Sequence, residues 1–198
     1  TRRPEIVAVV NDGHLGVDEV VQEFSSQLAL LTFRTPSPRS GPSVARNVAL
    51  DPLRTPLIAF LDDDNLMWPF WLERAADLLE NDPTVSDIYG AQLRDKDFSI
   101  TEKYWFLVPY DLDRLRRANF IDLNQLMHRA SEVRFDTQMR RLVDWDYVLK
   151  LIDRLPGEIV PADAISSIYS TGLSGRITVA GWPPDLAEIA AHRRDGQS

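Results

Sequence analysis

Two short runs of the sequence are apolar at every position, and they restrict the possible fold more than any other feature. They are Ile6 to Val10 and Leu57 to Leu61. A continuous apolar run is typical of a strand that is buried on both faces, as in the centre of a parallel sheet. Segments with helical apolar spacing, Val17–Phe24 and Pro69–Glu80, follow these strands. The alternation predicts an α/β fold with a mostly parallel central sheet flanked by helices.

The same patterns give the other expected elements. In the first half we expect strands over Leu28–Phe33 and Asp87–Leu93, and a helix that runs from an N-cap at Ser43 to Leu50. The second half is more irregular. Its expected helices are Asp111–Ala118, Leu142–Leu155 and Pro184–His192, its extended segment is Phe120–Met127, and its short strands are Glu158–Val160, Ile165–Tyr169 and Ile177–Ala180.

Length and charge limit the classes of protein. A chain of 198 residues can form one sizeable core but is short for two domains, so we expect a single domain. The net charge of -8 disfavours a general nucleic-acid binder. The sequence has no cysteine, which excludes disulfides and cysteine-ligated metals and fits a reducing compartment. We expect a cytoplasmic protein, with a peripheral position at the inner membrane face as the alternative.

Three adjacent aspartates follow the second apolar run directly, and they are the strongest chemical signal in the chain. Open α/β folds bind ligands at the carboxyl ends of their strands. In an extended segment alternate side chains share a face, so Asp62 and Asp64 would converge while Asp63 points away. Adjacent carboxylates repel one another, and Mg²⁺ or Mn²⁺ would relieve the repulsion. A solvated acidic turn is the structural alternative, but the position after a buried strand favours a ligand site.

Three further segments hold candidate site residues, and each has an ordinary structural alternative. Asn11 and Asp12 end the first strand at the same edge of the sheet, although Asp-Gly is also a common turn. Arg46 lies near a helix start that could meet a diphosphate, or it is a plain surface arginine. Asp144 and Asp146 lie about 200° apart on a helix, so one would face the site and the other solvent. A carboxylate near a helix start can also be a mere cap.

Together these segments resemble the family 2 glycosyltransferases, which have the GT-A fold. The resemblance covers roughly residues 5 to 170. It rests on four motifs that occur in the family's order and at suitable spacing, and on a smaller match in the middle section. The four motifs are Val9–Gly13, Gly41–Asn47, Phe60–Asn65 and Val143–Asp146, and the smaller match comprises Asn119–Asp122, Met127–Arg129 and Phe135–Asp136.

The resemblance implies an enzyme that moves a sugar from a nucleotide-diphosphate sugar to an acceptor hydroxyl, with inversion at the anomeric carbon. Asp12 would bind the nucleobase, and Asn11 stands where the family often has an acid. Arg46 would lie near the nucleotide. The acceptor would be a saccharide, a lipid or a small molecule. Residues 1–93 would form the nucleotide-binding half, residues 94–175 the acceptor and catalytic half, and residues 176–198 a C-terminal extension.

The resemblance also assigns the acids. The metal, Mg²⁺ or Mn²⁺, would lie on Asp64, and Asp62 or Asp63 would assist at the metal or at the donor ribose. Asp144 would be the catalytic base that removes the proton of the acceptor hydroxyl. These roles match the reaction, because a cation stabilises a leaving diphosphate and a carboxylate on the opposite side activates the nucleophile.

Other functions fit the sequence less well. A phosphatase of the haloacid-dehalogenase type would need Asp-x-Asp-x-Thr or Asp-x-Asp-x-Val, whereas Leu66 stands at the last position here. A phospho-receiver domain would need a later lysine, and a dinucleotide-binding oxidoreductase would need a glycine-rich first turn. The principal alternative is a non-catalytic domain of the same fold that binds a nucleotide-sugar or acts as a scaffold.

The first strand raises a question of its own. Family members usually have one more strand and helix before it, so the outer edge of Ile6–Val10 would lack a partner. A preceding segment, another chain, such as a second copy in a homo-oligomer, or a later segment would fill this place. The later candidate is Arg176–Ala180, which would have to pair in parallel with Ile6–Val10.

Overall fold

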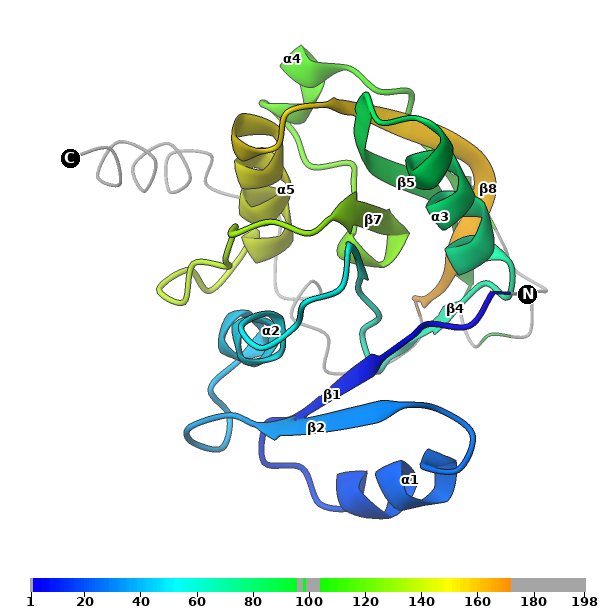
Figure 1. Cartoon of the computed structure of the whole chain (residues 1–198). Helices are drawn as coiled ribbons and strands as arrows, with labels where there is room; N and C mark the ends of the chain where they lie inside the picture. The colour runs from blue at the N-terminus through cyan, green and yellow to red at the C-terminus, as the bar shows by residue number, and fades with distance from the viewer. Residues whose placement is uncertain (1, 96–97, 99–103, 172–198) are drawn as a thin grey trace.

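The computed structural model describes residues 2–95, 98 and 104–171. Figure 1 shows a small layer of β1, β2 and α1 that is separated from a larger sheet by α2. The strands are β1 (Val7–Asn11), β2 (Leu30–Arg34), β3 (Leu57–Ala59), β4 (Asn65–Met67), β5 (Val85–Asp95), β6 (Tyr104–Phe106), β7 (Leu126–Arg129) and β8 (Glu158–Ser170). The helices are α1 (Val17–Phe24), α2 (Pro42–Leu50), α3 (Trp71–Asn81), α4 (Leu112–Leu115), the 3₁₀ turn η1 (Leu123–Gln125) and α5 (Val143–Arg154).

The strands form two sheets, and the larger one is mixed rather than mostly parallel as the sequence predicted. β1 and β2 pair in parallel as a two-stranded sheet. The six-stranded sheet has the order β3-β7-β5-β8-β4, with β6 added to β5. Its parallel pair is β5–β8, and its other pairs are antiparallel. Parallel strands are usually joined through a crossover helix. Among the described residues between β5 and β7, the helical elements are α4, which has four residues, and the 3₁₀ turn η1, which has three.

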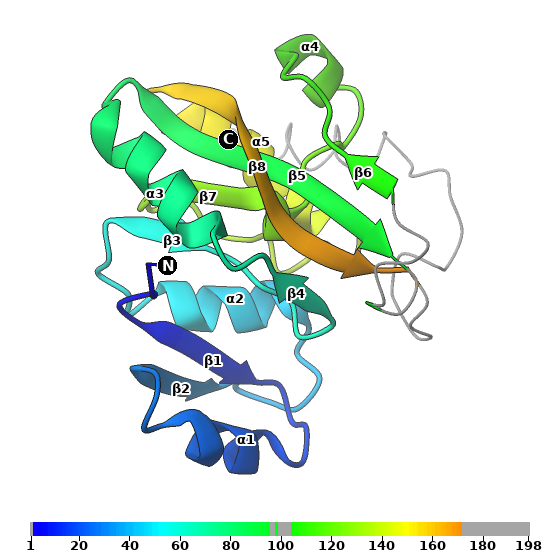
Figure 2. The same cartoon turned by 90° about the vertical axis from the view of Figure 1, so that its right-hand side faces the viewer.

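Two helices cover the two faces of the larger sheet. In Figure 2, α3 lies in front of the sheet and α5 behind it. α3 buries Trp71 and Leu79, and α5 buries Trp145 and Leu151. Neighbouring residues of β5 serve the two sides, because Ile88 belongs to the cluster around α3 and Tyr89 to the cluster around α5. The core therefore consists of two apolar clusters with the sheet between them.

Several element boundaries differ from the sequence predictions. α2 begins at Pro42 with Gly41 as its N-cap, so Ser43 lies inside the helix and is not the cap. Proline suits the first helical position, which explains the earlier start. The expected helix over 111–118 is reduced to α4, the expected extended segment over 120–127 contains η1, and the two expected strands after residue 157 are one strand, β8. The expected elements at 177–180 and 184–192 lie outside the described residues.

The N-terminal layer contributes little to the core. Among the described residues, the side chains before Leu50 that are buried belong to Asn11 and Ser43, which are both polar. α1 has the predicted apolar spacing, yet none of its residues is buried. β1 pairs with β2 alone and β3 with β7 alone within the described part of the chain, so each has an edge without a described strand. The expected partner over 176–180 lies outside the described residues.

Within the described residues, the structure has no helix that is long and apolar enough to span a bilayer.

Candidate active site

Arg46 joins two aspartates that are far apart in the sequence. It comes from α2, its side chain is 14% exposed, and both ends of its guanidinium group are used. Nη1 donates to Oδ1 of Asp144 at 2.8 Å, and Nη2 donates to Oδ1 of Asp62 at 2.7 Å. Asp144 lies in the first turn of α5, and Asp62 follows β3. The structure thus brings together three of the predicted site residues in one ion-paired group.

The other oxygen of Asp62 is held by Asn124, a residue that the sequence analysis did not single out. Asn124 Nδ2 donates to Oδ2 of Asp62 at 3.0 Å and to Oδ1 of Asp122 at 2.7 Å, and Asn124 Oδ1 accepts the backbone N–H of Asp62 at 2.7 Å. Asp122 caps η1, with Gln125 completing a capping box. The Asp-x-x-Gln spacing was the signal in the sequence that could have located this turn.

The charges of this group perturb its pKa values. Burial raises the pKa of Asp144 to about 6, and the negative charges of Asp122 and Asp62 add to the rise, while Arg46 opposes it. Burial likewise raises the pKa of Asp122. The pKa of Arg46 is raised because Asp144 and Asp62 outweigh the effect of its burial. Three carboxylates therefore face one guanidinium, and the site keeps an excess of negative charge when all three are ionised.

The aspartate triplet lies in a turn and not in an extended segment. The N–H of Asn65 donates to the carbonyl of Asp62 at 3.1 Å, which closes a turn over residues 62–65 between β3 and β4. The expectation that Asp62 and Asp64 alternate with Asp63 along a strand is therefore wrong. Asp63 is exposed, whereas Asp62 and Asp64 are half-buried. Within the described residues, no three His, Asp or Glu side chains are grouped closely enough to hold a metal ion by themselves.

Asn11 and Asp12 order the loops at the end of β1. Asn11 Oδ1 accepts the N–H groups of Gly13 and His14 at 2.9 and 2.8 Å. Asp12 Oδ1 accepts Thr35 Oγ1 at 2.6 Å, and its Oδ2 accepts the N–H of Gly41 at 2.8 Å. Neither Asn11 nor Asp12 forms a hydrogen bond or an ion pair with Arg46 in the described part of the chain, so they lie outside the ion-paired group.

The loop contacts also set the acidity of Asp12. Burial would raise the pKa of Asp12, but the hydrogen bonds from Thr35, Gly41 and Ser40 outweigh it and hold the pKa below its usual range. Asp12 is therefore ionised at neutral pH, and it fixes the loop that leads into α2.

Asp144 and Asp146 point in different directions, as their helical spacing predicts. Asp144 contacts Arg46, whereas Asp146 forms an ion pair with Lys150 at 2.6 Å on the next turn of α5. Asp146 is 3% exposed, so the expectation that the second aspartate faces solvent is wrong. Its charge is balanced by Lys150, which leaves Asp144 as the acid of α5 that belongs to the site.

The comparison with known sequences identifies the family. Residues 2–142 match the family model described as glycosyl transferase family 2. Over 154 residues the chain is 24% identical to the teichoic acid poly(glycerol phosphate) polymerase of Staphylococcus epidermidis. That alignment covers 72% of this chain and 21% of the relative, so the chain spans about a fifth of the length of this curated protein.

Solved structures share the fold. S. aureus TarS in complex with UDP-GlcNAc superimposes with a TM-score of 0.70 at 15% identity, covering 92% of this chain and 54% of TarS. The mannosyltransferase PcManGT from Pyrobaculum calidifontis, in complex with GDP-Man and Mn²⁺, gives a TM-score of 0.56 at 18% identity, covering 96% of this chain and 61% of that one. The predicted fold class is confirmed by these neighbours. The chain has the GT-A fold and belongs to glycosyl transferase family 2.

Proposed function

We propose that this chain is the catalytic domain of an inverting glycosyltransferase, which moves a sugar from a nucleotide-diphosphate sugar to an acceptor hydroxyl. The observation that carries the proposal is the ion-paired Asp144, whose pKa is raised to about 6 beside Asp62. A base with this pKa is ionised at neutral pH and still basic enough to take a proton. The donor class is supported by two fold neighbours, which were solved with UDP-GlcNAc and with GDP-Man.

Asp144 would act as the general base through one defined oxygen. Arg46 occupies Oδ1 of Asp144, so Oδ2 would accept the proton of the acceptor hydroxyl. As the hydroxyl oxygen attacks the anomeric carbon, the bond from that carbon to the diphosphate breaks, and its electron pair leaves with the nucleoside diphosphate. Attack from the opposite face inverts the configuration, and no covalent sugar–enzyme intermediate is required.

The donor would contact residues from both parts of the fold. Asn11 and Asp12 would contact the nucleobase from the end of β1, where they already order the surrounding loops. Asp62 and Asp63 would contact the ribose from the turn before β4. The acceptor would enter from the side of Asp144, on residues 94–175.

A divalent cation, Mg²⁺ or Mn²⁺, fits the chemistry of the acid group. Asp64 would be the main ligand, as the motif implies, and Asp62, whose two oxygens accept hydrogen bonds from Arg46 and Asn124, would be a secondary one. Mg²⁺ is commonly held by one or two carboxylates, with water and substrate phosphates completing its shell. When bound, the cation would neutralise the charge that develops on the leaving diphosphate. PcManGT, solved with Mn²⁺, supports this choice of metal.

The proposal can be tested by donor turnover in the presence of Mn²⁺ or Mg²⁺. UDP-GlcNAc and GDP-Man are the first donors to try, with water as the acceptor where no other is known. Asp144→Ala and Asp64→Ala should each reduce turnover at least about 100-fold. EDTA should abolish it, and Asp77→Ala, on the exposed side of α3, is the matched control.

Two results would contradict the proposal in different ways. If Asp144→Ala and Asp64→Ala both leave turnover at the wild-type rate, the assignment of base and metal ligand is wrong. If the wild type binds nucleoside diphosphates with metal but turns over no donor, the chain is the non-catalytic binding domain. Thermal shift detects that binding, because a ligand of the native state raises the melting temperature.

A further inference from the structure

We propose that Arg46 is a positioning residue that fixes the base Asp144, rather than a ligand of the nucleotide as its sequence motif suggested. This inference rests on the proposed function of Asp144. Arg46 lies 98 residues before Asp144 in the chain and donates to it at 2.8 Å, while its second nitrogen is held by Asp62 at 2.7 Å. The guanidinium group is planar, so these two bonds fix the position of Oδ1 of Asp144 relative to Asp62.

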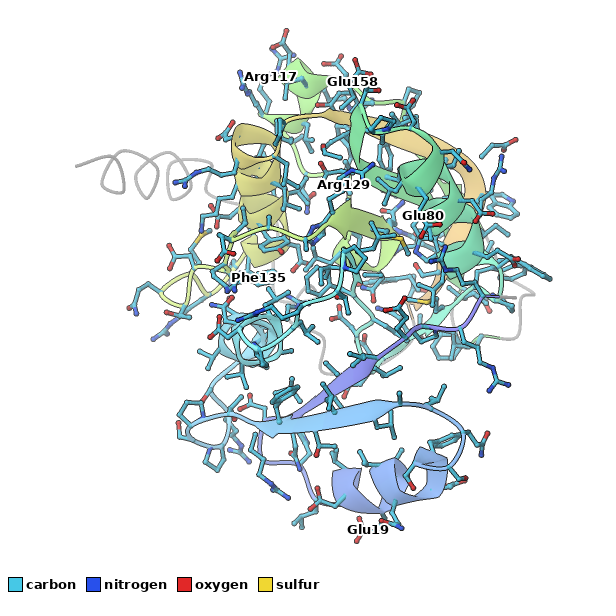
Figure 3. The ribbon with its side chains drawn as sticks, in the orientation of Figure 1. Glu19, Glu80, Arg117, Arg129, Phe135 and Glu158 are labelled. Atoms are coloured by element: carbon cyan, nitrogen blue, oxygen red, sulfur yellow. The ribbon has the colours of Figure 1, made fainter. Side chains whose placement is uncertain are left out.

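The position of Arg46 is itself fixed by the segment around Phe135. The guanidinium carbon lies 5.2 Å from the centre of the Phe135 ring. Asn47, the next residue of α2, binds the backbone of Phe135 twice, through a donated and an accepted hydrogen bond of 2.9 Å each. Figure 3 shows Phe135 between α2 and α5. The motif Arg46-Asn47 therefore holds one segment with two consecutive side chains.

The support continues to the helix that carries the base. The rings of Phe135 and Tyr147 are stacked, with centres 4.0 Å apart and planes 5° apart. Tyr147 lies on α5, one turn after Asp144. Arg46 therefore contacts α5 in two ways. It donates directly to Asp144, and through the Phe135 ring it is connected to Tyr147 on the next turn of the same helix. A side chain held in this way has little freedom to reach a donor.

The orientation matters because the reaction uses the oxygen that Arg46 does not hold. The hydrogen bond from Arg46 to Oδ1 restricts rotation of the Asp144 carboxylate and leaves Oδ2 for the acceptor hydroxyl. A misplacement of about 1 Å in such a group can reduce a rate about 100-fold. Lysine at position 46 would keep the charge but has one nitrogen, so it could not hold Asp62 and Asp144 in the same arrangement.

The kinetic test separates positioning from donor binding. We expect Arg46→Lys and Arg46→Met to lower kcat about 100-fold or more. The KM for the donor and the Kd for UDP or GDP with Mn²⁺ should change less than about threefold, because Asn124 still holds the N–H and Oδ2 of Asp62 in these variants. Arg2→Lys is the matched control. Arg2 also donates through both of its terminal nitrogens, in this case to the two carboxylate oxygens of Glu80 on the exposed side of α3. A tenfold rise in KM and Kd with kcat unchanged would overturn the inference and make Arg46 a nucleotide ligand.

A second measurement does not depend on turnover, so it remains informative if the proposed function fails. Urea unfolding of Arg46→Met, Asp144→Asn and the double variant forms a double-mutant cycle. If Arg46 holds Asp144, Asp144→Asn should raise the free energy of unfolding more in Arg46→Met than in the wild type. The coupling between the two substitutions should be at least about fivefold in the unfolding constant. Additive effects would show that Arg46 does not hold Asp144. Coupling in a wild type that turns over no donor would reject the proposed function but not the pairing.

Discussion

Replacing Asp144 by asparagine should stabilise the protein while it abolishes turnover. The pKa of Asp144 rises from 3.8 to about 6, chiefly because the carboxyl group is buried. A carboxyl group with a higher pKa in the folded chain holds its proton more tightly there than in the unfolded chain. Its ionisation therefore opposes folding: the stability that is present below pH 3.8 is lost as the pH rises through about 6.

The two pKa values give the size of the effect. One pKa unit corresponds to about 1.4 kcal/mol, so ionised Asp144 reduces the free energy of unfolding by about 3 kcal/mol near pH 7.5. The reduction falls to about 1.6 kcal/mol near pH 5 and to about 0.6 kcal/mol near pH 4. The side chain of Asp144 is 26% exposed, and solvent screens part of this penalty. We therefore expect the variant to gain about 1–2 kcal/mol near pH 7.5.

Urea unfolding followed by tryptophan fluorescence measures the gain. Wild type and Asp144→Asn are compared near pH 7.5, pH 5 and pH 4, and the advantage of the variant should shrink steadily toward the lowest pH. Asp77→Asn, on the exposed side of α3, controls for a general change in net charge and should show no such trend. An advantage that is the same at every pH, or a variant less stable than wild type throughout, would refute the reasoning.

Three other predictions follow from the same contacts. The kcat/KM for the donor should fall about tenfold per pH unit below about pH 6, because the base must be ionised, and a pH–rate profile with no such limb would exclude Asp144 as the base. Gly90→Ala should lower the free energy of unfolding by about 1–3 kcal/mol, measured in urea, because a Cβ there would lie 2.8 Å from the Trp71 ring. Asn124→Ala should destabilise the protein by about 1–3 kcal/mol and reduce turnover, because the N–H and Oδ2 of Asp62 lose their partner, and a stability equal to wild type would show that water replaces the amide.

The sequence located the elements whose formation depends on local pattern. α1 has the predicted bounds, Val17–Phe24, since apolar residues three and four apart define a helix face whether or not that face is buried. The antiparallel placement of β7 depends on pairing with distant strands, so no local pattern indicated it. α2 begins before the expected N-cap at Ser43, because proline suits the first helical position and Pro42 occupies it.

The residues of the site were predictable from local motifs, whereas the contacts between them were not. Asp62, Arg46 and Asp144 were singled out from motifs, and the structure brings them into contact. Their arrangement was not predictable, because the ion pairs connect α2, the end of β3 and α5. The role of Asn124 was not predictable for the same reason, because it depends on a hydrogen bond to Asp62, which lies 62 residues away in the chain.

The thin N-terminal layer has a consequence for affinity. Because no apolar side chain of β1, α1 or β2 is buried, we expect this layer to open locally at a lower free energy than the six-stranded sheet, with faster amide hydrogen exchange. Asn11 and Asp12 belong to this layer, so a donor would bind only the closed fraction of molecules, and the apparent Kd would rise as that fraction falls. A strand added to the outer edge of β1 would then act as an effector: it would strengthen donor binding without contacting the donor.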